Sequence, residues 1–159
     1  MRRDPNLMRL SREHHTGLVL AKRARELPAN DESQRRVAWA EIRAGFAEQL
    51  EPHFALEEQG LLPALRAVGE DALVERTLAE HAALRALVAS DAPEAPSRFG
   101  DTLSAHIRFE ESALFETAQQ VLPAPVLAEL GALHEAAARP ACPTALRKTD
   151  AHGSHGSKP

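Results

Sequence analysis

The chain has 159 residues, of which 43% are hydrophobic and only 4% aromatic, and its formal net charge is -4. This length suits one domain with a sizeable core, and the charge, without a long basic stretch, argues against nucleic acid as a partner. Alanine, leucine, glutamate and arginine are abundant, whereas β-branched and aromatic residues are few, which favours helices over strands. We therefore expect an all-α fold.

Cysteine usage and hydropathy limit where the protein acts. The single cysteine, Cys142, excludes an intramolecular disulfide framework and a cysteine-rich metal site. Apolar runs are far shorter than the ~20 residues that a membrane-spanning helix needs. The charged first residues are not followed by the apolar core of a signal peptide. We expect a cytoplasmic protein without a membrane partner.

The first two predicted helices are separated by a polar, proline-containing break. The first covers about residues 6–27, and the second covers about 32–67. Pro52 lies inside the second helix, where it removes one backbone hydrogen bond. We expect a kink there, or a break at Leu50–Glu51.

Three further helices follow. The third covers about residues 70–90, the fourth runs from Ser97, a suitable N-cap, to Leu122, and a shorter fifth covers about 125–139. Four long amphipathic helices joined by short loops predict an up-down-up-down four-helix bundle, with the fifth helix across one end.

The end of the chain has a different composition. From Pro140 onward the helical pattern is lost, and the last residues lack apolar side chains large enough to bury. Residues 1–139 are therefore predicted to form the bundle, and residues 140–159 a flexible, disordered tail.

The second predicted helix has polar residues on its apolar face. His53 and Glu57 lie in that stripe, at positions where leucines are expected. Burying a carboxylate is costly unless a partner or a metal compensates for the lost hydration, so a compensating group is expected here. In steps of three and four, the stripe consists of Ile42, Phe46, Leu50, His53, Glu57, Leu61 and Leu65.

The fourth predicted helix repeats this arrangement with His106 and Glu110, which follow Phe99 and Leu103 on one face. Residues four apart lie one helical turn apart, so the imidazole and the carboxylate can bind the same ion. In each helix a second glutamate follows the first, and at five residues from the histidine it points away from the face. Glu58 and Glu111 are therefore predicted at the rim, with Glu111 an alternative to Glu110 if the helix bulges.

The other two long helices each offer one inward histidine. His81 lies at core spacing among Val74, Leu78, Leu84 and Val88. On the first helix, His14 lies among apolar residues, whereas His15 lies at the edge of the stripe, so His14 is preferred and His15 is the alternative. His134 on the fifth helix is predicted to be structural or exposed.

Four imidazoles and two carboxylates exceed what one tetrahedral zinc ion needs. They suit two metal ions bridged by the carboxylates, with an open position for a small ligand. Imidazole with carboxylate favours iron over magnesium or calcium, while manganese and zinc remain alternatives. The predicted ligands are His14, His53, Glu57, His81, His106 and Glu110.

This ordered set resembles the hemerythrin-like family of HHE cation-binding domains, which carries His, His-x-x-x-Glu, His and His-x-x-x-Glu on four successive helices. The resemblance covers about residues 6–122 and implies a di-iron site bridged by carboxylates and an oxo or hydroxo group. The rival di-iron bundle, the ferritin-like one, needs Glu-x-x-His, and none of the eight histidines has a glutamate three residues before it.

The chain also departs from the animal oxygen carriers of this family. They have two histidines spaced by four on the third helix, whereas Thr77 precedes His81 here, and they use His-x-x-x-x-Asp on the fourth helix. One fewer protein ligand leaves a position for water, His15 or a nearby glutamate. This implies a more reactive centre than one for reversible oxygen carriage.

Several functions fit such a centre. The first is a non-haem di-iron protein that binds or senses O2, NO or reactive oxygen and nitrogen species. The others are a di-iron redox enzyme that removes peroxide or NO, and an iron storage or delivery protein. A metal-free interaction bundle would require the histidines and glutamates to satisfy one another. The sequence leaves the oligomeric state open.

Overall fold

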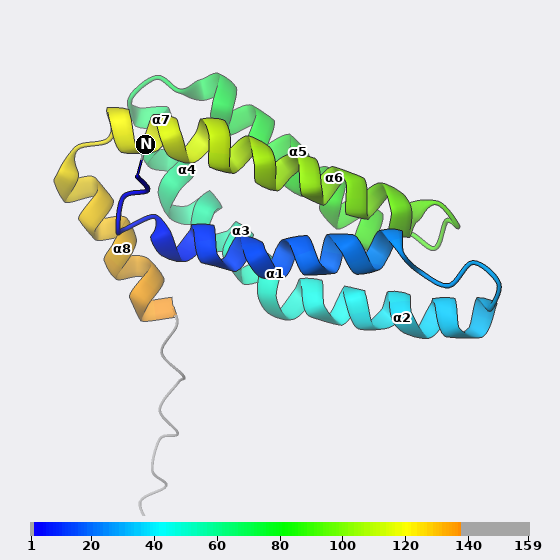
Figure 1. The fold of residues 1–159 in the computed structure, drawn as a ribbon. Helices are drawn as coiled ribbons and strands as arrows, with labels where there is room; N and C mark the ends of the chain where they lie inside the picture. Colours follow the sequence, from blue (N-terminus) through cyan, green and yellow to red (C-terminus); the bar gives the residue numbers. More distant parts are fainter. Residues whose placement is uncertain (1, 138–159) are drawn as a thin grey trace, which may run out of the picture.

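In a computed structural model, residues 2–137 are described, and they form a bundle of four long helices with a fifth crossing one end (Figure 1). This confirms the predicted all-α bundle. The first long helix is α1, Met8–Arg25, and the third is α5, Asp71–Ala89. The predicted tail, and the boundary at residue 139, lie outside the described residues.

The second and fourth long helices consist of several consecutive segments. The second contains α2 (Glu32–Gly45), η1 (Phe46–Leu50), α3 (Glu51–Leu56), η2 (Glu57–Leu61) and α4 (Leu62–Ala67). The fourth contains α6 (Ala95–Phe109), η3 (Glu110–Leu114) and α7 (Phe115–Val121). The crossing helix is α8, Ala124–Ala137.

The η segments are π-helical turns, in which a backbone N–H bonds to the carbonyl five residues earlier. Leu62 N–H bonds to Glu57 C=O in η2, and Phe115 N–H bonds to Glu110 C=O in η3. The helix neither breaks nor stops at Pro52. Instead, the wider turn of η1 ends directly before the α3 segment that contains this proline, which accommodates the missing N–H.

The start of the fourth helix differs from the prediction. Ser97 is not its N-cap, because α6 begins at Ala95 and Glu94 occupies the cap position. Pro96 lies in the first turn, where a helical N–H would have no partner and the fixed φ of proline suits the helix. The N-cap therefore lies three residues closer to the N-terminus than predicted.

Two close contacts at glycines set the packing of α1 against α6. A Cβ atom added to Gly100 would lie 2.5 Å from the backbone oxygen of Ala21, and one added to Gly17 would lie 2.8 Å from Cδ1 of Ile107. Glycine at these positions brings the two helices close enough for residues near the middle of both to converge.

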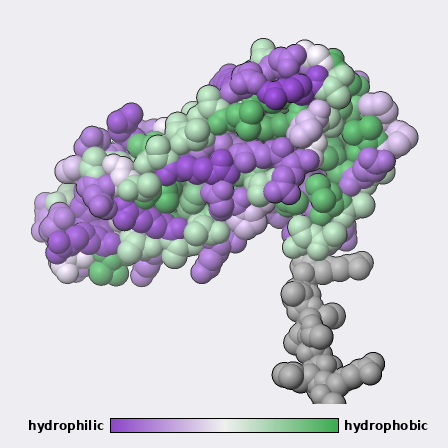
Figure 2. Space-filling model, turned by 180° about the vertical axis from the view of Figure 1, so that it is seen from behind, coloured by the Kyte–Doolittle hydropathy of each residue, from purple (hydrophilic) through white to green (hydrophobic). Residues whose placement is uncertain are grey.

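Two apolar clusters fill the bundle. One contains Phe115 and reaches Leu127 and Leu130 of α8, and the other contains Phe54 and Trp39. Figure 2 shows apolar side chains gathered on the surface at the end where α8 lies, while the opposite end is largely hydrophilic. None of the described helices combines the length and the apolar character that crossing a membrane requires.

Candidate metal centre

The six side chains predicted as metal ligands lie together inside the bundle, with at least one from each long helix. His15 is exposed and Glu111 only partly buried, so His14 and Glu110 are the inward members of the two pairs that the sequence left open. All six have an exposed fraction of 3% or less: His14, His53, Glu57, His81, His106 and Glu110.

Glu110 lies between histidines from two different parts of the bundle. Its Oε2 is 2.9 Å from Nε2 of His14 on α1, and its Oε1 is 3.0 Å from Nε2 of His106 on α6. The same Oε1 is 3.7 Å from Nε2 of His81 on α5. One carboxylate therefore faces imidazoles on both of its sides.

Glu57 has the matching arrangement. Its Oε1 is 3.4 Å from Nε2 of His53, and its Oε2 is 3.3 Å from Nε2 of His81. The two carboxylates thus lie between two positions where a cation could bind. One position is beside α1 and α3, and the other is beside α5 and α6. The donor groups close enough to hold a cation are His14, His53, Glu57 and Glu110 at the first position, and His81, His106 and Glu110 at the second.

None of these close approaches has hydrogen-bond geometry. Buried polar atoms are almost always satisfied in native proteins, so a group of unsatisfied ones needs an explanation. A cation at each position would satisfy all of them at once, and the donor set therefore fits two metal ions. Within residues 2–137, the atoms here without a hydrogen-bond partner are Nε2 of His14, His53, His81 and His106, and both carboxylate oxygens of Glu57 and Glu110.

The other nitrogen of each histidine, Nδ1, donates a hydrogen bond to a second set of carboxylates, the outer glutamates. An ionised carboxylate only accepts, so one proton resides on Nδ1, and Nε2 is the nitrogen that can bind a cation at the centre. The four pairs are Glu111 with His14 at 2.7 Å, Glu13 with His53 at 2.9 Å, Glu58 with His81 at 2.8 Å, and Glu80 with His106 at 2.8 Å.

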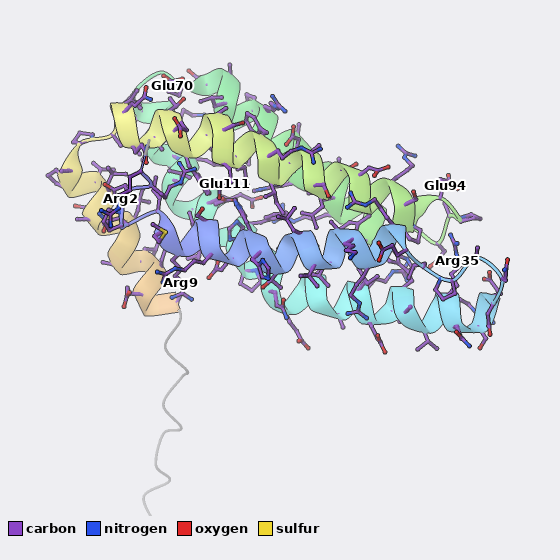
Figure 3. All side chains as sticks on the ribbon, viewed as in Figure 1. Arg2, Arg9, Arg35, Glu70, Glu94 and Glu111 are labelled. Carbon is purple, nitrogen blue, oxygen red and sulfur yellow. The ribbon has the colours of Figure 1, made fainter. Side chains whose placement is uncertain are left out.

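The outer glutamates join the four long helices in a closed ring of contacts. Each one is the sequence neighbour of an inner residue on its own helix but binds the histidine of another helix. Figure 3 shows Glu111 between α1 and the helix that contains α6. From there it accepts the hydrogen bond of His14. In order, the contacts run from α1 to α3, from η2 to α5, from α5 to α6, and from η3 back to α1.

Each outer glutamate also contacts an arginine, so the negative charge of this outer layer is balanced. Since the layer is close to neutral, the two inner carboxylates alone remain to balance the charge of bound cations. The arginine pairs are Arg9 with Glu13, Arg76 with Glu80, Arg85 with Glu58, and Arg3 with Glu111, at 2.7–2.9 Å.

The carboxylates strongly affect the histidines. Burial lowers the pKa of His53, but Glu57 and Glu13 outweigh it and raise this pKa to about 10. Burial also lowers the pKa of His106, while Glu110 and Glu80 raise it to about 9. Without metal these imidazoles therefore bind protons at neutral pH, and a metal ion has to displace them.

Two of the π-helical turns, η2 and η3, begin at the inner carboxylates. Glu57 is the first residue of η2, and Glu110 is the first residue of η3. Pro63 follows η2, but no proline follows directly after η3. Proline alone therefore does not explain why a π-helical turn forms at both glutamates. Single π turns inside α-helices are frequent at functional sites, because they shift side chains relative to the helix face.

The chain matches the sequence profile of the Hemerythrin HHE cation binding domain over residues 9–118. It belongs to the hemerythrin HHE family. The matched range contains all six inner residues and extends from α1 into α7. Comparisons with curated proteins and with solved structures gave no match. Membership confirms the resemblance seen in the sequence and identifies a helical cation-binding domain.

In this hemerythrin-like domain, Thr77 occupies the place on the third helix where the animal oxygen carriers have a further histidine. Thr77 is fully buried, and its hydroxyl donates a hydrogen bond to Leu73 C=O at 2.9 Å. The hydroxyl hydrogen of Thr77 is therefore bound within its own helix. The cation position beside His81 thus has one imidazole fewer than a second histidine on this helix would provide.

The outer glutamates on α1 and α5 are not evident from the sequence. Glu13 and Glu80 each precede an inner histidine and are off the apolar face, so a helical pattern alone places them in solvent. Their repeated position could have indicated them, since Glu-His occurs at 13–14 and again at 80–81. Glu58 and Glu111, in contrast, lie at the rim as expected.

The structure excludes one of the two alternatives predicted for His134 of the hemerythrin-like domain. This histidine is not exposed: its exposed fraction is 1%, and neither of its ring nitrogens has a hydrogen-bond partner among the described residues. The spacing of Leu127, Leu130 and His134 on α8 could have shown this, because steps of three and four place all three on one buried face.

Proposed function

We propose that this domain binds two iron ions and uses an open coordination position to bind or sense O2, NO or a reactive oxygen or nitrogen species in the cytoplasm. The observation that supports this proposal is the set of eight unsatisfied atoms that face one another around two adjacent positions. Family membership supports the cation-binding part.

The donor types favour iron. Four imidazoles with two carboxylates suit iron, whereas magnesium and calcium prefer oxygen ligands alone, and the described cluster contains no thiolate. Two imidazoles at each position leave room for ligands that the protein does not supply. Iron(II), when bound, supplies electrons that a small ligand such as O2 or NO can share.

The side chains around the centre hold it rigid and exclude bulk water. His14 stacks on Phe115 at 5.3 Å between ring centroids, and His81 stacks on Phe54 at 3.8 Å. The outer glutamates fix the Nδ1–H form of each imidazole and so keep Nε2 directed inward. A site so enclosed admits only small molecules.

A groove beside His53 favours a redox enzyme as a second candidate. It has a volume of about 700 Å³ and is lined by polar residues such as Gln49 and Gln59 as well as by His53 and Glu13. His53 thus lies close to a surface depression that can receive a reductant or a reactant. Turnover of peroxide or NO that is lost in Glu57→Ala would favour this candidate over simple binding.

Metal analysis tests the proposal most directly. Protein produced without an affinity tag and loaded with iron should contain about two iron ions per chain. The reduced protein should develop a near-ultraviolet or visible absorption band when exposed to O2 or NO. A fully loaded protein without any spectral change would contradict the proposed function, while His15→Gln, which alters only an exposed histidine, should leave both results unchanged.

A further inference from the structure

The fifth helix contributes a buried histidine that neither the inner residues nor the outer glutamates use. His134 lies on the buried face of α8, where Leu127 and Leu130 occupy the preceding turns. The unsatisfied atoms of the metal centre would be satisfied by cations. The two nitrogens of His134 lie outside both groups of donors that can hold a cation, so they need another partner.

Glycines at two contacts fix the orientation of α8. A Cβ atom added to Gly131 would lie 2.4 Å from Oδ1 of Asn6, and one added to Gly60 of η2 would lie 2.9 Å from a methyl group of Leu130. Arg9 of α1 donates a hydrogen bond to the carbonyl of His134 at 2.8 Å. Figure 3 shows Arg9 beside α1 near the end of α8. These contacts hold α8 against η2 and the N-terminal part of the chain, and so fix the position of His134.

A small cavity adjoins this histidine. It has a volume of about 230 Å³, enough for several water molecules, and is lined by Asn6, Arg9 and Glu135 as well as by His134. His134 is also connected to the metal centre, because Arg9 binds both the carbonyl of His134 and the carboxylate of Glu13, the hydrogen-bond partner of His53. Arg9 lines both this cavity and the depression beside His53 and Glu13, so the cavity adjoins the α1–α3 side of the centre.

Burial lowers the pKa of His134 and outweighs the opposing effects of Glu13 and of the backbone of Asn6, so the imidazole is neutral at neutral pH. A neutral imidazole has one N–H donor and one acceptor nitrogen. Molecules that only accept weak hydrogen bonds, such as O2 and NO, do not satisfy both. Small neutral molecules that carry O–H or N–H groups together with lone pairs do satisfy both.

We propose that the cavity beside His134 is an inlet site of the candidate centre, which takes small neutral molecules that both donate and accept hydrogen bonds. Water, hydrogen peroxide and hydroxylamine share this chemistry. Binding in the cavity does not depend on the proposed function, because the site is formed without metal. Only the delivery of the bound molecule to the centre rests on that function. The cavity would bring such a molecule next to the His53–Glu57 side.

The binding step is tested on zinc-loaded protein, which is inert to redox chemistry, labelled with 15N-histidine. Hydrogen peroxide and hydroxylamine are added in separate titrations, and the nitrogen resonances of His134 are identified from their loss in His134→Gln. We expect a saturable shift of these resonances, with His15 unaffected. Resonances of His134 that stay unchanged with both probes would overturn the site, whatever the result for iron. A shift with one probe only would identify which molecule the site takes.

The delivery step is tested on iron-loaded protein with two variants. His134→Leu removes both nitrogens, while His134→Gln retains a donor and an acceptor. We expect the spectral change induced by hydrogen peroxide to be at least tenfold slower in the leucine variant and largely retained in the glutamine variant. The change induced by NO should have the same rate in all three proteins. Equal slowing with peroxide and NO would show a structural role and overturn the inlet, and so would unchanged peroxide kinetics.

Discussion

Nδ1 of His53 lies 2.9 Å from Oε2 of Glu13. Glu13 precedes His14 on α1, but its hydrogen-bond partner is this histidine of α3. The pair is therefore a contact between helices, and it fixes an imidazole of α3 from α1. Because Glu13 also binds Arg9, its carboxylate is held from two sides. The orientation of His53 thus depends on how α1 and α3 are aligned.

Removing the charge of Glu13 should weaken metal binding at the position beside α1 and α3. In Glu13→Gln the amide no longer stabilises the Nδ1–H form as a carboxylate does, and we expect metal affinity to fall by about 10- to 100-fold. Competition with a chromophoric chelator measures this change. Glu41→Gln is the matched control, because Glu41 contacts Arg23 at the surface. Equal affinities for the two variants would contradict the role of Glu13.

The two positions should respond differently to loss of a carboxylate and loss of a histidine. Glu110 belongs to both donor groups, whereas His81 belongs to one. We expect His81→Gln to retain about one ion per chain and Glu110→Gln to retain less than that. Metal analysis after gel filtration gives both values. A variant at Glu110 that keeps a full complement of metal would show that this carboxylate does not bridge.

Metal binding should release protons. The pKa of His53 is raised to about 10 and that of His106 to about 9, so both imidazoles are protonated at pH 7 in the metal-free protein. Cations and protons compete for Nε2, and affinity should therefore rise as the pH increases from 7 to 9. Calorimetry in two buffers of different ionisation enthalpy counts the protons released. Binding that is independent of pH in this range would contradict the described charge states.

The same groups predict how the stability of the metal-free protein depends on pH. A histidine whose folded pKa exceeds its unfolded value of about 6.5 stabilises the folded state fully below pH 6.5. This contribution is lost as the pH rises through about 9 and 10, the folded values for His106 and His53. We expect the Tm of the metal-free protein to fall between pH 6.5 and 10. The metal-loaded protein should show a smaller fall, because its imidazoles bind metal instead of protons.

The close contact between α1 and α6 should not tolerate a methyl group. In Gly100→Ala the new Cβ would meet the backbone oxygen of Ala21, so the helices must separate, at a cost of about 1–3 kcal/mol. Thermal unfolding should show a Tm lower by several degrees. Gly45→Ala is the control, since its Cβ would meet only the end of the Leu20 side chain, which can move. A Tm for Gly100→Ala at or above that of the control would contradict this packing.

Much of the fold and of the inner set follows from periodicity. His53 and Glu57 replace leucines in a regular stripe, and a buried stripe is a local property that the sequence encodes. The π turns are less evident, because one wide turn changes the register without changing composition. Consecutive steps of four residues from His53 to Glu57 and Leu61 are nevertheless longer than the 3.6 residues of an α-helical turn.

The outer glutamates Glu13 and Glu80 could not be placed in the same way, since their histidine partners lie on other helices. Glu80 is off the apolar face of its own helix and becomes half-buried only because His106 approaches it from α6. The start of α6 was misplaced for a local reason. Ser97 has the chemistry of an N-cap, but Pro96 fixes the first turn and outweighs it.

The ring of outer glutamates and the two inner carboxylates describe a molecule built from two similar parts, residues 8–67 and 71–121. Each part supplies two imidazoles to its own cation position but faces a carboxylate of the other part there. A peptide equal to one part alone would carry two imidazoles and one carboxylate. It would complete this donor set only by pairing with a second copy of itself. The full chain therefore contains in one molecule a donor set that a chain of half the length would have to form as a dimer.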